Sequence, residues 1–278
     1  MAPKYVYIND TFVAADQASL LITDLAIQRG YGIFDFFKTI GGKPIFLQDH
    51  IDRFYNSAHK MHMEIPYTHE ELKTILAQLM EKNDLPDSGI RLTLCGGYSP
   101  DGFTMPAKQN LIITQLPFKM DLSLNTKGIK IVTRNYQRQL SGMKTIDYSM
   151  AIWLQPFIKE NNADDVLYHD NGQVKEVPRA NFFMVSQANE IITAKTNILP
   201  GVIRKNLLAL KNNDFNIIER DFSLEELDHA NEAFITSTTK HIMPVVQIDG
   251  KPVGDGKAGK ISTALLDLLV EKVIEHQA

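Results

Sequence analysis

Short apolar segments alternate with amphipathic helical patterns along the whole chain. The segment 49–62 shows the change clearly, because its spacing turns from strand-like to helical. One face of this helix is apolar, while His50, Arg53 and Ser57 share another face at spacings of three and four residues. The pattern therefore predicts a helix that offers polar side chains from one side.

Capping residues mark the starts of two other helices, and a proline interrupts a third. Thr68 with Glu71, and Ser223 with Glu226, have the spacing of a capping box, which predicts a helix after each pair. Pro156 falls inside a third helical pattern, where it is expected to kink the helix because it cannot donate a backbone hydrogen bond.

The alternation breaks once near the middle of the chain. Residues 119–127, KMDLSLNTK, fit neither a strand nor a helix and predict an interdomain linker. We expect a small N-terminal α/β domain at residues 1–118 and a larger C-terminal domain with a strand-rich core at residues 128–278. The predicted fold class is α+β with two domains.

Composition excludes several classes of protein without naming a chemistry. The chain has 278 residues, of which 44% are apolar and 22% are charged, and its net charge of −4 gives no overall attraction to nucleic acid or anionic membranes. Cys95 is the single cysteine, so neither a disulfide framework nor a zinc cluster is expected, and no metal is predicted. No apolar run is long enough for a membrane span and no secretory signal is recognisable, so we expect a cytoplasmic protein.

Two residues have the character of catalytic groups. Lys144 lies in the loop-like SGMKTIDY, where it is either a solvated side chain or an amine with a lowered pKa that forms a Schiff base. Glu176 follows the Asn171-Gly172 turn of a predicted hairpin. A carboxylate here is either an ordinary strand residue or a partner that keeps a pyridine nitrogen protonated.

Several other groups suit a phosphate. Pro200-Gly201 precedes a predicted helix whose first backbone N–H groups are free to bind an anion, and the hydroxyl-rich TSTTK follows a strand. The candidate donors are Val202, Ile203, Ser237, Thr238 and Arg53. An amine, a carboxylate and a phosphate cup are together what pyridoxal 5′-phosphate requires.

The order of these motifs resembles the fold-type IV, or class IV, pyridoxal-phosphate aminotransferases. The matching segments are YINDTFV, GIFDFFKTIGGKPIFLQDHIDRFYNSA, MKTIDY, NGQVKEVPRANFFMV, ILPGVIRKNLL and TSTTKHIMPVVQIDGKPVGDGK. The family includes branched-chain and D-amino-acid aminotransferases and aminodeoxychorismate lyase. The resemblance implies a homodimer whose two domains enclose the cofactor.

The resemblance also implies roles for individual residues. Lys144 would be the Schiff-base lysine, Glu176 the partner of the pyridine nitrogen and Arg53 the phosphate-binding arginine. The remaining phosphate ligands it implies are Val202, Ile203 and Thr238, with Ser237 beside them.

The sequence departs from the family pattern near these groups. Ile203 stands where many members have threonine, which removes a side-chain donor, and Asp147 stands where many have asparagine. Tyr148 follows and is a candidate partner for the phenolic oxygen of the cofactor.

The substrate pocket departs further. In D-amino-acid aminotransferases a tyrosine, an arginine and a histidine bind the substrate carboxylate; the corresponding positions here are Phe34 and Gly96, with His50 retained. Arg91 is then the candidate anchor for a carboxylate, with a structural ion pair in a buried strand as the alternative. Phe34, Phe36 and Tyr98 are expected to form an apolar wall, unless they are plain core residues.

The sequence thus predicts a transaminase that moves an amino group from a hydrophobic or branched-chain L-amino acid to a 2-oxo acid, through Lys144. Aminodeoxychorismate lyase activity, which releases pyruvate to give 4-aminobenzoate, is the alternative with the same cofactor. A cofactor-binding or interaction protein without catalysis is a third hypothesis. Neither nucleic acid nor a membrane is expected as a partner.

Overall fold

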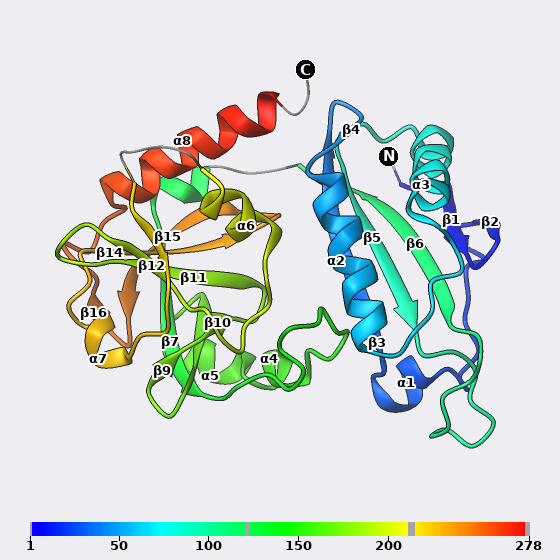
Figure 1. The fold of residues 1–278 in the computed structure, drawn as a ribbon, viewed down its shortest axis with the longest axis horizontal. Helices are drawn as coiled ribbons and strands as arrows, with labels where there is room; N and C mark the ends of the chain where they lie inside the picture. The colour runs from blue at the N-terminus through cyan, green and yellow to red at the C-terminus, as the bar shows by residue number, and fades with distance from the viewer. Residues whose placement is uncertain (1, 120–122, 211–214, 276–278) are drawn as a thin grey trace. The chain divides into compact units, whose positions relative to one another are not determined.

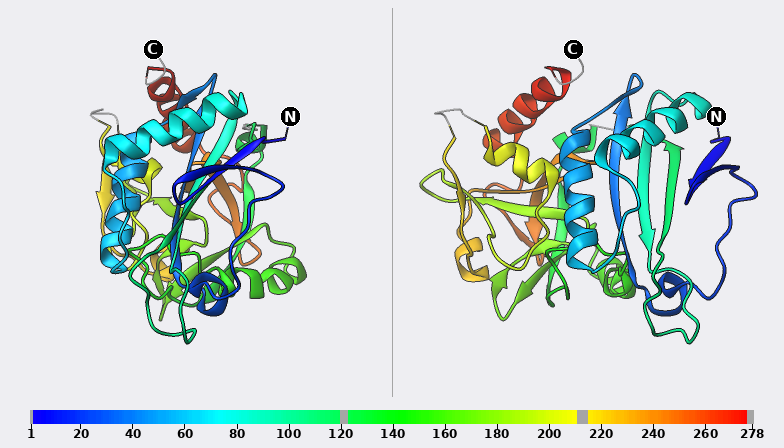
Figure 2. Two further views of the ribbon diagram at one scale, coloured as in Figure 1. Left: turned by 90° about the vertical axis from the view of Figure 1, so that its right-hand side faces the viewer. Right: turned by 45° about the vertical axis from the view of Figure 1, so that its right-hand side comes forward.

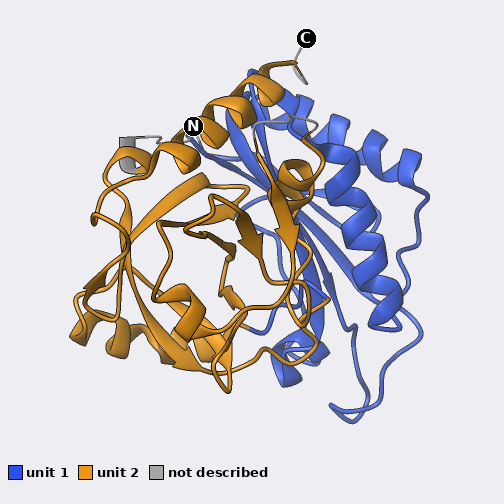
Figure 3. Cartoon of the chain, turned by 60° about the vertical axis from the view of Figure 1, so that its left-hand side comes forward, with its two compact units in different colours: residues 1–119, 143–147, 277 blue, residues 120–142, 148–276, 278 orange. Residues whose placement is uncertain are grey.

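The computed structural model describes residues 2–119, 123–210 and 215–275 (Figure 1, with two further views in Figure 2). The chain divides into two compact units, each with helices and strands, which confirms the α+β prediction (Figure 3). Unit 1 comprises Met1–Lys119 and Met143–Asp147, and unit 2 comprises Met120–Gly142 and Tyr148–His276. Part of the predicted linker, residues 120–122, lies outside the described residues.

Unit 1 is built on one six-stranded antiparallel sheet in the order β2-β1-β6-β5-β3-β4. Its strands are β1 (Tyr5–Ile8), β2 (Thr11–Ala14), β3 (Gly32–Ile40), β4 (Lys43–Pro44), β5 (Ser88–Cys95) and β6 (Asn110–Pro117). Its helices are α1 (Leu25–Arg29), α2 (Leu47–Lys60) and α3 (His69–Asn83). Strands β1 and β2 form one hairpin, and β3 and β4 form another.

Helices α2 and α3 bury their apolar faces against one face of this sheet (Figure 2). Leu72, Leu76 and Leu79 recur at helical spacing on α3 and are fully buried, which stabilises the unit by about 1.5–3 kcal/mol for each side chain. The predicted capping box at Thr68 and Glu71 begins α3, with both reciprocal hydrogen bonds formed.

The segment Met143–Asp147 packs as part of unit 1, although its position in the sequence led us to expect it in the C-terminal domain. The reason is that it hydrogen-bonds to the edge of β3: the Phe34 N–H donates to the Lys144 carbonyl at 2.8 Å, and the Ile146 N–H donates to the Gly32 carbonyl at 3.0 Å. Backbone pairing at a free strand edge is invisible in the local pattern of a loop.

Unit 2 contains a curled, ten-stranded mixed sheet with the path β13-β12-β11-β14-β15-β7-β8-β9. Two further strands lie off this path, because β10 pairs with β11 and β16 with β15. Its strands are β7 (Ile129–Asn135), β8 (Asp165–Asp170), β9 (Gln173–Val174), β10 (Glu176–Val177), β11 (Ala180–Val185), β12 (Ile191–Thr193), β13 (Ile217–Glu219), β14 (Glu232–Ser237), β15 (His241–Ile248) and β16 (Lys251–Pro252). Its helices are the 3₁₀ turn η1 (Ser123–Thr126), α4 (Ser149–Trp153), α5 (Gln155–Glu160), α6 (Val202–Leu208), α7 (Leu224–Leu227) and α8 (Lys260–Glu275).

Two local predictions for unit 2 are confirmed. Asn171 and Gly172 both have positive φ, as a type I′ turn between β8 and β9 requires. The helix containing Pro156 is interrupted at Leu154 and so divides into α4 and α5.

One predicted capping box is only half correct. Ser223 does cap α7 by accepting from the Glu226 N–H, but the Glu226 carboxylate is bound to Arg220 and not to the helix start. A guanidinium offers a carboxylate two charge-assisted donors, which outcompete a single backbone N–H.

The end of α3 is fastened to the first strand by one buried amide. The Asn83 side chain accepts from the backbone N–H groups of Lys4 and Tyr5 at 2.9 and 2.8 Å. It also donates to the Tyr5 carbonyl and to Gln115, both at 3.1 Å. One side chain of α3 thus satisfies polar groups of β1, of β6 and of the residue that precedes β1.

We expect Asn83→Ala to lower the free energy of unfolding by about 2–4 kcal/mol, because it leaves these buried groups without partners. Urea denaturation measures the loss. The control is Gln78→Ala on the exposed side of the same helix, which should change stability by less than about 0.5 kcal/mol. Equal effects of the two substitutions would show that the amide network contributes nothing.

Candidate active site

Lys144 is held by its backbone on both sides. Its N–H donates to the Ser57 hydroxyl of α2 at 3.3 Å, and its carbonyl accepts from the Phe34 N–H of β3. The half-buried side chain carries its Nζ to 4.6 Å from the centre of the Phe34 ring. The backbone of Lys144 is therefore bound to two elements of unit 1, and its side chain is half-buried.

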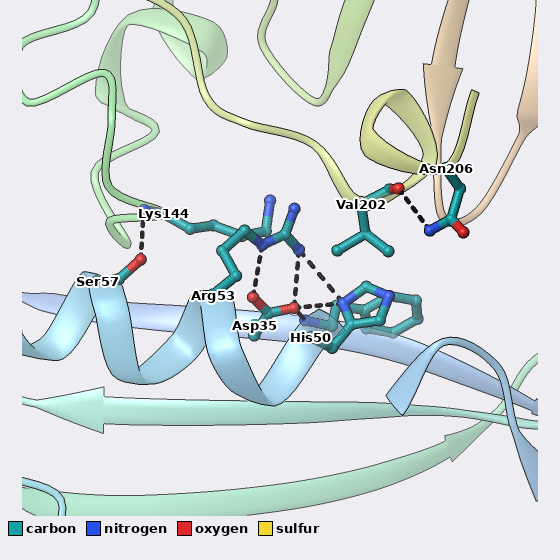
Figure 4. Close-up of polar contacts among 8 residues, drawn as sticks. Asp35, His50, Arg53, Ser57, Lys144, Val202 and Asn206 are labelled. Atoms are coloured by element: carbon teal, nitrogen blue, oxygen red, sulfur yellow. Dashed lines mark hydrogen bonds and ion pairs between the residues drawn. The ribbon is translucent and has the colours of Figure 1, made fainter. Parts of the chain in front are cut away.

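Three charged or titratable side chains meet on the helix-facing side of β3 (Figure 4). Asp35 receives the Arg53 Nε on one oxygen and the Arg53 Nη2 on the other, both at 2.8 Å. His50 Nδ1 lies 2.7 Å from the same carboxylate. His50 and Arg53 are one turn apart on α2, which is why the spacing in the sequence puts both over Asp35.

The charges in this cluster set the protonation of its members. Burial alone would raise the pKa of Asp35, but the charges and hydrogen bonds of Arg53 and His50 hold it well below its usual range. Burial lowers the pKa of His50, and the positive charges of Arg53 and Lys144 add to this, against the opposing effect of Asp35. Asp35 is thus ionised and His50 neutral near pH 7.

The opposite face of the same strand carries the aromatic side chains. Side chains alternate along a strand, so Phe34 and Phe36 point to the face opposite Asp35. Arg91 of the neighbouring strand β5 is the cross-strand partner of Phe36 and shares this face. The Arg91 guanidinium carbon lies 3.9 Å from the centre of the Phe34 ring. Although β5 is largely buried, the Arg91 side chain is exposed, and its Nε donates to the Thr93 hydroxyl at 3.3 Å.

Two predicted substrate residues lie elsewhere. His50 is fully buried and faces the helices, on the other side of the sheet from Phe34 and Arg91. Tyr98 lies beyond the end of β5, bridged to Asp24 and 38% exposed, so the sheet does not align it with Phe34 and Phe36. The sheet of unit 1 thus does not bring His50 or Tyr98 beside Phe34 and Arg91.

Glu176 is buried in unit 2, and both of its oxygens are engaged. Oε1 accepts from Arg138 Nε at 2.8 Å, and Oε2 accepts from the backbone N–H of Leu199 at 2.9 Å. Arg138 also donates to the Ser141 carbonyl at 2.7 Å. The carboxylate is therefore held by donors from two segments of unit 2.

The loop before α6 is fixed at several points. Asp221 accepts from the backbone N–H groups of Lys195 and Thr196 at 2.9 and 3.0 Å, and Asn181 donates to the Leu199 carbonyl at 2.7 Å. Arg204 of α6 is buried and donates to the Ala194 carbonyl at 2.8 Å. The start of α6 is therefore anchored to the sheet of unit 2.

This helix start fits an anion. Gly201 is the N-cap and provides no side-chain cap to the helix. A Cβ at Gly201 would approach Asn181 Oδ1 to 2.0 Å, so glycine is required by this close approach. Val202 and Ile203 are buried in the first turn, where backbone N–H groups point out of a helix.

Hydroxyl groups lie at the end of β14 and in the turn that follows it. Ser237 accepts from the Lys240 N–H at 3.2 Å, and Thr238 is half-buried in the turn that follows. Thr236, two residues earlier, is buried, and its hydroxyl has no hydrogen-bond partner among the described residues. Tyr148 lies at the N-cap of α4 and is half-buried.

Sequence reasoning missed the groups that hold the predicted ones. Asp35 was visible only as a lone acid between aromatic residues in a buried strand, and Arg138 and Asn181 carried no local signal. Lys38 was also missed: it is buried in β3, and burial lowers its pKa to about 7. The side chains that Asp35 and Arg138 bind, and the carbonyl that Asn181 binds, are 15 or more residues away along the chain, so no spacing rule reveals these pairs.

The donor set matches what pyridoxal 5′-phosphate requires. Unit 1 offers the Lys144 amine and the Arg53 guanidinium, while unit 2 offers the Glu176 carboxylate and the open start of α6.

None of the helices in the described ranges combines the length and apolar character of a membrane crossing.

Comparison with known proteins places the chain in a family. The model for amino-transferase class IV matches residues 32–248. A D-alanine aminotransferase of Listeria monocytogenes is 31% identical over 97% of this chain and 96% of its own length, and one of Bacillus licheniformis is 26% identical over 98% of each. The solved structure of the branched-chain amino acid aminotransferase from Escherichia coli has a TM-score of 0.88 at 21% identity, covering 98% of this chain and 94% of the other.

These relatives are aminotransferases and do not favour the lyase alternative. The similarity in structure confirms the two-domain, fold-type IV architecture. Family members work with pyridoxal 5′-phosphate, for which this chain has the matching groups. The chain belongs to the class IV aminotransferases and is a pyridoxal-phosphate-dependent enzyme.

Proposed function

We propose that this aminotransferase takes its amino group from a hydrophobic L-amino acid, whose carboxylate Arg91 binds, and gives it to a 2-oxo acid. The observation that carries the proposal is that two cationic groups lie over the Phe34 ring. The Lys144 Nζ is 4.6 Å from the ring centre, and the Arg91 guanidinium carbon is 3.9 Å from it. An amine for the cofactor and an exposed cation for a carboxylate are thus held by one apolar surface.

Lys144 has two tasks in this proposal. When bound, pyridoxal 5′-phosphate supplies an aldehyde that links to an amine and a pyridine ring that withdraws electrons. Lys144 would hold the cofactor through its amine, and when free this amine would act as the base that takes the proton from the substrate Cα. Its backbone bonds to Ser57 and Phe34 keep the side chain directed for both tasks.

Glu176 would accept a hydrogen bond from the protonated pyridine nitrogen. Its hydrogen bonds from Arg138 and the Leu199 N–H stabilise the ionised carboxylate, which then favours a protonated ring nitrogen. The phosphate is bound by Arg53 and by the backbone N–H groups of Val202 and Ile203. Ser237 and Thr238 contribute hydroxyls, and Tyr148 is the partner proposed for the phenolic oxygen.

A D-amino acid, in the first place D-alanine, is the second candidate donor. The observation that favours it is the name of the sequence relatives, since the Listeria monocytogenes and Bacillus licheniformis proteins are D-alanine aminotransferases. The replacement of two carboxylate-binding positions by Phe34 and Gly96 supports the L-type donor instead.

We also propose that the enzyme is a homodimer. Two segments of unit 1, one around Ile22 and one around Phe103, expose large apolar side chains. Ile22 is 75% exposed and Phe103 is 81% exposed. The backbone joins the segments, because the Ser99 N–H donates to the Thr23 carbonyl at 3.1 Å. An exposed apolar surface of this kind is typical of a contact between subunits.

Replacement of the lysine tests the chemistry. We expect Lys144→Ala to lower the rate of transamination by at least about 10²–10⁴-fold, because no other group replaces its amine. Absorbance spectra of the purified holoenzyme should lose the band of lysine-bound cofactor. Lys60→Ala, an exposed lysine on α2, is the control and should keep both activity and spectrum. An unchanged spectrum in Lys144→Ala would contradict the assignment.

A donor screen with Arg91 variants tests the substrate. L-Leucine and D-alanine are compared with 2-oxoglutarate as acceptor, and the shift from pyridoxal to pyridoxamine absorbance is followed. Arg91→Gln should raise the KM of the preferred donor by about 10–100-fold, because a charge-assisted pair is lost, while the cofactor spectrum stays the same. Turnover of D-alanine alone would replace the L-type proposal by the second candidate, and an unchanged KM would exclude Arg91 as the anchor.

Charged substitutions test the dimer. Sedimentation of the holoenzyme should give twice the mass of a single chain, and Ile22→Asp with Phe103→Asp should shift it to the monomer, because a buried unpaired charge is costly. Ile274→Asp, at an exposed apolar side chain on α8, should leave the mass unchanged. A monomeric parent enzyme would contradict the proposal.

A further inference from the structure

We infer that Asp35 and His50 are positioning residues that orient Arg53 so that a single edge of its guanidinium remains for a phosphate group. The inference rests on the proposed role of Arg53 and extends it to two residues that do not themselves bind the cofactor. It concerns the phosphate group alone and not the reacting atoms.

The guanidinium is held side-on. Asp35 binds its Nε and Nη2 atoms at 2.8 Å each, which uses one full edge of the planar group. The edge that carries Nη1 is not part of this pair. Two parallel hydrogen bonds fix the plane of the guanidinium as well as its distance from Asp35. The directions of its remaining N–H groups are therefore fixed too.

Asp35 is fixed in turn by its own surroundings. Its carboxylate is completely buried, and it accepts from His50 Nδ1 at 2.7 Å and from the Phe36 N–H at 2.8 Å in addition to Arg53. A buried carboxylate is costly unless such donors compensate it. The acid therefore cannot turn without losing several bonds at once.

His50 acts as a neutral donor in this cluster. Burial and the nearby charges of Arg53 and Lys144 lower its pKa, so Nδ1–H donates to Asp35 and Nε2 carries the lone pair. Nε2 is buried and has no hydrogen-bond partner in the described part of the chain. A proton there would add a buried charge beside two cations, which the site disfavours.

Charge and orientation make opposite predictions for Asp35→Asn. If the carboxylate only balanced the charge of Arg53, its removal would strengthen the attraction between Arg53 and a phosphate. If it orients the guanidinium, its removal weakens phosphate binding although the net positive charge rises. Asp35→Glu keeps the charge and lengthens the side chain by one methylene group, and so changes the orientation alone.

The experiment compares pyridoxal 5′-phosphate with pyridoxal, which lacks the phosphate, by equilibrium dialysis against the apoenzyme. We expect Asp35→Asn and Asp35→Glu to raise the Kd of pyridoxal 5′-phosphate by about 10–100-fold, and that of pyridoxal by less than about threefold. Asp52→Asn, at an exposed acid on α2, is the control and should change neither value. An unchanged or lower Kd for pyridoxal 5′-phosphate in Asp35→Asn would overturn the inference.

Three further variants keep the test decisive. Arg53→Gln should lower the preference for the phosphorylated ligand; if it does not, the proposed role of Arg53 fails, whereas an effect of Arg53→Gln without an effect of Asp35 refutes the inference alone. If the Asp35 variants do not fold, His50 carries the test. His50→Asn retains an N–H for Asp35 and should keep the preference, whereas His50→Leu should reduce it. Equal preferences in these two variants would refute the role of His50.

Discussion

The alternation of side chains along β3 is the constraint on which unit 1 depends. Residues at odd positions face the helices, so Asp35 meets the side chains of α2, while Phe34 faces the other way with Arg91. The edge of the same strand binds the backbone of Lys144. A shift of one residue in the pairing of β3 would exchange the two faces and destroy every one of these contacts together.

Each unit contains a buried carboxylate that binds an arginine. Asp35 holds Arg53 in unit 1, and Glu176 holds Arg138 in unit 2, with distances of 2.8 Å in both pairs. Buried ion pairs contribute little net stability, because desolvation offsets their attraction. These pairs instead fix orientation. A carboxylate that accepts several hydrogen bonds is held in one orientation, and it holds the guanidinium bound to it in one orientation as well.

The sequence predicted the elements better than the contacts between them. The helix over α2, the capping box of α3 and the Asn171-Gly172 turn all follow from local spacing, and all are present. The assignment of Lys144 to unit 1 did not follow, because it depends on hydrogen bonds to β3, more than a hundred residues away. Local patterns carry information about neighbours in sequence and none about partners across the fold.

The same limit applies to the candidate site residues. Lys144, Glu176 and Arg53 stand in recognisable motifs, whereas Asp35 was unremarkable in a strand of aromatic residues. His50 was expected near a substrate, but its burial on the helix side of the sheet makes it a partner of Asp35. A motif identifies the residue type, and only the pairing of the strands decides which face it occupies.

The replacement of threonine by Ile203 gives the loop before α6 a particular importance under the proposed function. Without a hydroxyl at this position, the helix start offers an anion only backbone N–H groups, and these cannot be redirected by a side-chain rotation. Their positions must therefore be correct before the anion binds. This accounts for the three anchors of the loop, which are the bonds from its backbone to Asp221, Glu176 and Asn181. Because Glu176 is one of them, the carboxylate proposed for the pyridine nitrogen and the amides proposed for the phosphate are held in one rigid piece of unit 2.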